Sequence, residues 1–133
     1  MNSSNKIPKG NNKEDRDERV KIIRQALKQL NGKEIVCPAL GNVPVKITSM
    51  GINETAFHAS KSYLSTLAAI DVENQIKTAQ FSRYHLPKPG GQAQKHNFAF
   101  TIELKGIIED RPTKLYVGVL ITAKYMHYCI TAQ

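Results

Sequence analysis

The amino-acid sequence predicts an α+β fold, with N-terminal helices followed by a mainly antiparallel sheet of about four strands. Two observations lead to this prediction. Apolar residues recur at helical spacing in the first third of the chain. In the last third they alternate with polar or small residues over three segments joined by short connections, as antiparallel strands with one face against helices do. Helices that precede a sheet in this way are typical of the α+β class.

The chain of 133 residues is long enough for one domain with one core. Residues 1–13 are polar and rich in turn formers, so we expect a flexible leader there and a single α+β domain over residues 14–133. The start of the chain lacks the apolar region of a signal peptide, and no apolar run approaches the ~18 residues of a membrane span. We therefore expect a cytoplasmic protein, or one segment of a larger polypeptide, without a membrane partner.

The formal net charge is +8, and the parts of the chain before and after residue 35 share the positive excess equally. A basic folded part favours polyanionic partners such as RNA, although many basic domains bind no nucleic acid. Cys37 and Cys129 are expected to be reduced core residues, with a disulfide between them as the less favoured alternative. The sequence has no CxxC motif and no Cys/His cluster, so it predicts neither a metal site nor a cofactor.

The first helix is expected over residues 15–30, where acidic residues occupy the start and Asn31-Gly32 forms a stop. Two short strands are expected within residues 34–49.

Three short helices follow them. They are expected to begin at Asn53, Ser60 and Asp71, and the first of them is expected to end near Ala59.

Residues 81–84 are expected to be extended. Residues 85–96 are predicted to be a loop, because two prolines and two glycines within five residues exclude regular structure. Strands are then expected over residues 98–105, 115–122 and 126–131.

The strongest candidate chemistry lies in a predicted helix. Thr55, His58 and Ser62 follow one another at spacings of three and four, so they share one helix face, with Lys61 beside them. Metal-free RNA cleavage needs a base for the 2′-hydroxyl, an acid for the 5′-oxygen and groups that hold the phosphate. Histidine suits the first two roles, so His58 is the first catalytic candidate. Lys61, Thr55 and Ser62 would contact phosphate, unless they are solvated or capping residues.

The final predicted strand is the second candidate. Alternation places His127, Cys129 and Thr131 on one face and Tyr128 on the apolar face. We expect His127 and Thr131 to face the helix that bears His58 and to form a cleft with it. Tyr128 is a core residue in the alternative interpretation.

The predicted loop is the third candidate. It carries Lys88, Lys95 and His96, and Arg83 comes just before it. These residues would lie over a phosphate backbone, unless the segment is an ordinary basic loop. The spacing around Gly90-Gly91 does not match a P-loop, so a nucleoside triphosphate site has no motif support.

Two segments of the chain together suggest a family. Residues 45–58 (VKITSMGINETAFH), followed by Lys61-Ser62 and a Leu/Ala-rich run, resemble a domain found in large polyvalent proteins of phage and conjugative elements. The ending, with LYVG at 115–118 and YCIT at 128–131, is similar to the same pattern. That domain belongs to the barnase/EndoU/colicin/RelE-like nuclease superfamily.

The resemblance covers about residues 34–132 and implies a metal-independent, toxin-like endoribonuclease, with helices followed by a four-stranded antiparallel sheet. Its active site would use a helix histidine and a hydroxyl or aromatic residue of a late strand. Here these would be His58, with Lys61 nearby, and Tyr128 or Thr131. RNA and an inhibitor or immunity protein would be the partners. Two alternatives stay open: a non-catalytic module of a mobile element that binds nucleic acid or protein, and a structural accessory domain.

Overall fold

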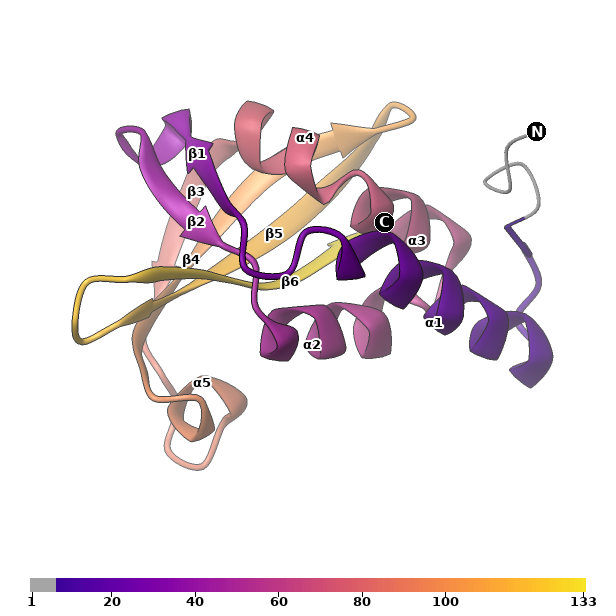
Figure 1. The fold of residues 1–133 in the computed structure, drawn as a ribbon, viewed down its shortest axis with the longest axis horizontal. Helices are drawn as coiled ribbons and strands as arrows, with labels where there is room; N and C mark the ends of the chain where they lie inside the picture. The colour runs from indigo at the N-terminus through magenta and orange to yellow at the C-terminus, as the bar shows by residue number, and fades with distance from the viewer. Residues whose placement is uncertain (1–6) are drawn as a thin grey trace.

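The protein combines four main helices with a six-stranded sheet (Figure 1), in a computed structural model that describes residues 7–133. The helices are α1 (Lys13–Lys28), α2 (Ser49–Ala59), α3 (Tyr63–Ile70), α4 (Val72–Thr78) and the one-turn α5 (Gln92–Lys95), with a short 3-10 helix at Pro38–Leu40. The strands are β1 (Glu34–Cys37), β2 (Val43–Lys46), β3 (Gln80–His85), β4 (Phe98–Ile108), β5 (Arg111–Leu120) and β6 (Tyr125–Ala132). The predicted α+β class is therefore confirmed.

The sheet is larger than the predicted sheet of about four strands. Its strand order is β1-β2-β6-β5-β4-β3, and every neighbouring pair is antiparallel except β2 with β6. The parallel contact joins Val45 to Tyr125 and Lys46 to Met126, and so adds the early β1–β2 hairpin to the late meander. Alternation marks a strand but not its distant neighbour, which is why the sequence did not predict this mixed sheet.

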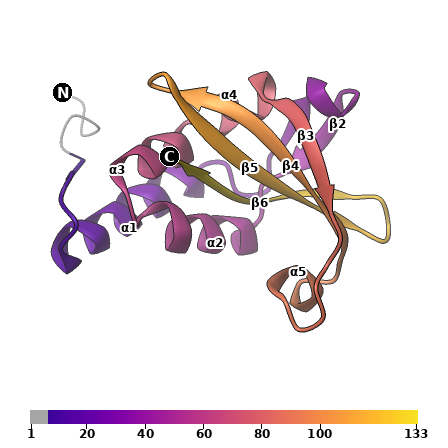
Figure 2. The ribbon, with the colours of Figure 1, turned by 180° about the vertical axis from the view of Figure 1, so that it is seen from behind.

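One face of the sheet carries the hydrophobic core. Helices α2 and α3 pack against β6, α1 packs on α2 and α3, and α4 contacts β1 and β4. Alternate strand residues, including Ile102, Leu104, Leu115, Val117 and Ile130, point into this core and are almost fully buried. Figure 2 shows the opposite face of β3, β4 and β5, which no helix in the described part of the chain covers.

Asp71 is the N-cap of α4, as predicted, but α2 and α3 are capped by other residues than expected. Helix α1 begins after Asn12, whose side chain accepts a hydrogen bond from Asp15 N. Helix α2 begins after Thr48, not at Asn53, and helix α3 after Ser62, not at Ser60. In each case a side-chain oxygen, the amide oxygen of Asn12 or the hydroxyl of Thr48 or Ser62, accepts from a free backbone N–H of the first turn and so determines where the helix begins.

The predicted leader over residues 1–13 lies partly outside the described residues. Its described part, from Ile7, is packed on the helices instead of being free. Ile7 is buried, and the Arg19 guanidinium donates hydrogen bonds to the carbonyls of Pro8 and Gly10. A buried cation on α1 thus orders backbone that has little apolar surface of its own.

The segment 85–96 was predicted to have no regular structure, but it contains the single turn α5. The two cysteines, Cys37 and Cys129, are buried and free, as expected.

Candidate active site on the uncovered sheet face

We call the uncovered face of β3, β4 and β5 the open face. It carries a row of polar side chains. Residues that alternate with the core positions of β4 point to it, and they lie opposite polar residues of β5. Register pairs join Glu103 to Tyr116 and Lys105 to Lys114. Strand periodicity therefore brings a carboxylate, a phenol and two ammonium groups onto one surface.

Glu103 is at the centre of the open face. Its side chain is only 4% exposed, although no helix of residues 7–133 lies over it. Oε1 lies 2.9 Å from Nε2 of His85, and Oε2 accepts a hydrogen bond of 3.2 Å from Ser82 Oγ. The guanidinium of Arg83 stands further out, with Nε 3.9 Å from Oε1. Side chains of β3, and not a helix, therefore cover this carboxylate.

These contacts keep Glu103 ionised. Burial by itself raises the pKa of the carboxyl, but the hydrogen bonds from His85 and Ser82 and the charges of Arg83 and Lys114 outweigh it. The pKa therefore lies below its ordinary value. A buried carboxylate that stays charged is an unusual group on a sheet surface, and perturbed groups of this kind concentrate at functional sites.

A pocket of about 240 Å³ lies next to this carboxylate. Loop and sheet residues line it together: Leu86, Pro87, Lys88, Gly91, Thr101, Tyr116 and Tyr128. Tyr116 connects the pocket to the polar centre, because its ring centroid lies 5.9 Å from that of His85. Burial, followed by the charge of Glu103, raises the pKa of Tyr116, so this phenol stays protonated.

A second polar cluster lies around Glu54 of α2; we call Glu54, His58 and His96 the Glu54 cluster. His58 Nε2 is 3.5 Å from Oε1, and His96 Nε2 is 3.8 Å from Oε2 of the same carboxylate. We call the segment between β3 and β4 the 86–97 loop. One imidazole from α2 and one from the end of this loop thus face the same carboxylate.

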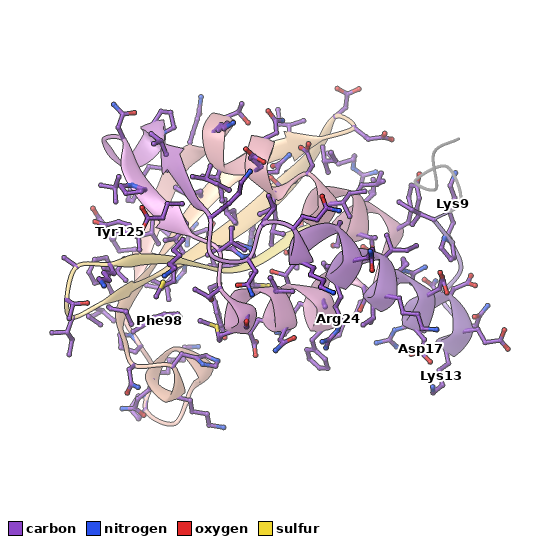
Figure 3. The ribbon with its side chains drawn as sticks, viewed as in Figure 1. Lys9, Lys13, Asp17, Arg24, Phe98 and Tyr125 are labelled. Atoms are coloured by element: carbon purple, nitrogen blue, oxygen red, sulfur yellow. The ribbon has the colours of Figure 1, made fainter. Side chains whose placement is uncertain are left out.

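Tyr128 lies between the Glu54 cluster and the pocket. Its ring contacts Phe98 at 5.5 Å and His96 at 5.7 Å between centroids. Figure 3 labels Phe98 near the 86–97 loop, at the start of β4. Burial first, and then the nearby Glu54 carboxylate, raises the pKa of Tyr128 to about 12. This phenol is therefore a fixed, neutral aromatic group.

Two predicted substrate-binding residues belong to the core instead. Thr55 and His127 are fully buried, and Thr55 Oγ1 lies 3.2 Å from His127 Nε2. Burial lowers the pKa of His127 to about 4, so it is neutral at ordinary pH. As the structure stands, neither side chain can reach a ligand.

The reason is a bulge in β6. Tyr116 pairs with Cys129, but the next residue of β5, Val117, pairs with His127. The extra residue is Tyr128, so His127 points into the core and Tyr128 lines the pocket on the open face. Both faces are the reverse of those that strict alternation predicted.

The other predicted site residues do not form one cleft. The Lys61 ammonium lies 4.6 Å from the ring centroid of Phe57, and Ser62 caps α3. Thr131 pairs with Lys114 on the open face.

Three further predicted residues lie near the open face or in its loop. Arg83 contacts Glu103, and Lys88 lines the pocket. Lys95 is exposed on α5.

Sequence reasoning did not single out Glu103, His85, Glu54 or Tyr116. Glu103 had a detectable signal, because an acidic residue stands between Thr101 and Lys105 on the polar side of a strongly alternating strand. The contact of Glu54 with His58 had a signal too, the i,i+4 spacing within α2. Its contact with His96 had none, since His96 comes from a distant loop.

The chain matches no family model, no curated protein and no solved structure. The resemblance to the nuclease superfamily therefore stays a prediction. Within residues 7–133, no three His, Cys, Asp or Glu side chains group closely enough to hold a metal ion. No helix of the described chain has both the length and the apolar character to cross a membrane.

Proposed function

We propose that this protein cleaves RNA by metal-independent acid–base chemistry at Glu103 and His85 on the open face. The observation that supports this proposal is the buried, ionised Glu103 carboxylate. It is in direct contact with an imidazole, on a sheet surface that no helix in the described part of the chain covers. In this proposal the acid–base roles expected of His58 and Lys61 fall to other residues, because the open face offers a base, an acid and cations together.

The reaction needs a base, an acid and positive charge. Glu103 takes the proton of the ribose 2′-hydroxyl, and the 2′-oxygen attacks phosphorus. His85, in its protonated form, gives a proton to the departing 5′-oxygen, so the products are a 2′,3′-cyclic phosphate and a free 5′-hydroxyl. This division of roles follows from the two groups: a carboxylate can only accept a proton, and an imidazolium can donate one.

The phosphate enters between the two groups. In the free protein Glu103 and His85 are in direct contact, with Oε1 2.9 Å from Nε2. His85 stands on the edge strand β3, and its side chain is 39% exposed, so it has room to turn outward. Arg83, which is more exposed still, and Lys114 supply positive charge beside the same carboxylate.

Two substitutions test the proposal directly. Glu103→Gln and His85→Ala should each lower the cleavage rate of single-stranded RNA in EDTA by about a hundredfold or more. The matched control is His58→Ala, which removes a histidine of the Glu54 cluster and should leave the rate close to that of the wild type.

The product and a deoxy substrate provide a second check. Cleavage should give a 2′,3′-cyclic phosphate and should not occur on the same sequence made of DNA. A rate that survives both Glu103→Gln and His85→Ala, but is lost with His58→Ala, would move the active site to the Glu54 cluster.

One observation favours a second candidate, a module that binds nucleic acid without cutting it. The Glu103–His85 contact is closed in the free protein, as a structural ion pair would be. In that case RNA binding should be strongly salt-dependent and no product should accumulate. Turnover under any metal-free condition would exclude this second candidate.

A further inference from the structure

The pocket beside Glu103 has the chemistry of a site for a flat, anionic ligand. Its walls are mostly apolar or aromatic. The loop after β3 contributes Leu86 and Pro87, and strands β5 and β6 contribute the rings of Tyr116 and Tyr128. The single charged lining residue among those described is Lys88. An aromatic ring with a phosphate attached matches this combination of surfaces.

The pocket is held in shape by its neighbours. The Tyr128 ring meets Phe98 nearly edge to face, with an interplanar angle of 82°, and it also meets His96. Phe98 in turn occupies the space over Gly118, where a Cβ atom would come within 2.3 Å of its ring. Glycine at this position leaves room for the Phe98 ring against the sheet, and Phe98 in turn supports Tyr128, so a ligand ring finds a preformed surface.

The pocket also lies at the right distance from the proposed reacting groups. Thr101 lines it, and Glu103 is the next residue of β4 on the same face. Two residues along a strand cover about 7 Å, a length that one nucleotide spans. Tyr116 borders both places, since it pairs with Glu103 and lines the pocket.

We propose that this pocket binds the base of a nucleotide next to the scissile phosphate, by stacking on Tyr128 beneath the 86–91 loop. This inference rests on the proposed function of the Glu103–His85 pair. The occupant is a nucleobase of single-stranded RNA, because unstacked bases present the flat faces that aromatic side chains hold.

Stacking, and not reading of base edges, should dominate. Thr101 is 8% exposed, and the Gly91 N–H is already bonded to the Lys88 carbonyl at 2.9 Å. The described lining thus leaves few groups that could distinguish one base from another, and stacking tolerates any base. We expect the affinities for adenine and uracil nucleotides to differ by less than the affinities for a nucleotide with a base and an abasic one.

The test uses a short single-stranded 2′-O-methyl oligouridine, which cannot be cleaved because its 2′-oxygen carries no proton. One abasic residue is placed at each position in turn, and binding is measured by fluorescence anisotropy. Loss of the base at one position should weaken binding by roughly ten- to a hundredfold. Tyr128→Leu should remove this position-specific penalty, and Tyr128→Phe should keep it.

A second variant guards against misfolding, since Tyr128 packs on Phe98 and His96. Leu86 is 82% exposed, so Leu86→Ser should fold normally and should also reduce the penalty. Its matched control is Ile121→Ser, at an 87% exposed position outside the pocket lining, which should keep the penalty.

The outcomes separate the pocket from the proposed reaction. Equal small penalties at all positions, or a penalty that persists in both Tyr128→Leu and Leu86→Ser, would overturn the pocket, even if the wild type cleaves RNA. A position-specific penalty in a protein that does not cleave RNA would support the pocket and overturn the reaction.

Discussion

Two buried titratable residues show how environment decides the charge of a side chain here. Glu103 has three polar partners from β3, and these outweigh the cost of burial, so it stays ionised. Among the described residues His127 has one, the Thr55 hydroxyl, and its buried Nδ1 finds no hydrogen-bond partner there, so it stays neutral. The number of partners thus separates a candidate reacting group from a core residue.

His127 should make folding sensitive to mild acid. Above pH 6.5 it is neutral in both states. Between pH 6.5 and about 4 only the unfolded chain takes up the proton. The free energy of unfolding should therefore decrease as the pH is lowered through this range, by roughly 3 kcal/mol in total. Urea titrations across this range measure the slope. His127→Gln cannot titrate, and an unchanged slope in that variant would contradict the assignment.

Arg19 should be a main contributor to stability. Its guanidinium is fully buried and donates to the carbonyls of Ser60, Pro8 and Gly10. Arg19→Met would leave these carbonyls without donors and should lower the free energy of unfolding by roughly 3 kcal/mol. Urea denaturation followed by circular dichroism measures this. The exposed Arg16→Met, on the same helix, should change it by less than about 0.5 kcal/mol.

At the scale of elements, the 86–97 loop connects the two polar clusters. Its first part lines the pocket through Leu86 and Lys88. At its other end His96 meets the Glu54 carboxylate of α2 and the ring of Tyr128 of β6. The loop is therefore attached to a helix and a strand that lie far apart along the chain.

His96→Ala should loosen this loop. Backbone amides over residues 86–97 should exchange with solvent severalfold faster, because the contacts of His96 with the Glu54 carboxylate and with the Tyr128 ring are lost together. Hydrogen exchange read by mass spectrometry measures this. His58→Ala is the matched control, since it removes the other imidazole from Glu54, and the described contacts of His58 are with Glu54 and Phe57 of its own helix. Equal acceleration in both variants would show that Glu54 itself, and not His96, holds the loop.

Over the whole molecule, the sheet separates two surfaces. Helices cover one face, and the other keeps Lys105, Lys114, Arg83 and the pocket accessible. The net charge of +8 is thus presented partly on the surface where the proposed chemistry lies.

Binding of an uncleavable RNA analogue should weaken linearly in a plot of log affinity against log salt concentration. Lys114→Gln, on the open face, should make the slope shallower by about 0.7, the value for one phosphate contact on a single strand. Lys28→Gln, at the end of α1 in the helical layer, should leave the slope unchanged. Anisotropy titrations at several salt concentrations measure both. An equal change of the salt slope in both variants would mean that the net charge of the whole molecule, and not the open face, determines RNA binding.

Part of the site was predictable from local patterns. Tyr128, Arg83, Lys88 and His96 were expected near a site, and all four lie at the open face, its pocket or the Glu54 cluster. His127 was placed on the wrong face, because one extra residue in β6 reverses the alternation and no local feature of the sequence marks it.

Short-range order was determined by the sequence alone. The period of 3.6 in α1, the period of two in β4 and β5 and the turn residues between them predicted the α+β class, since each depends only on neighbours along the chain. Tertiary structure decided which polar residues meet. The parallel β2–β6 contact, the β6 bulge and the cover of Glu103 by His85 all depend on register and burial between distant segments, and a linear pattern contains no information on either.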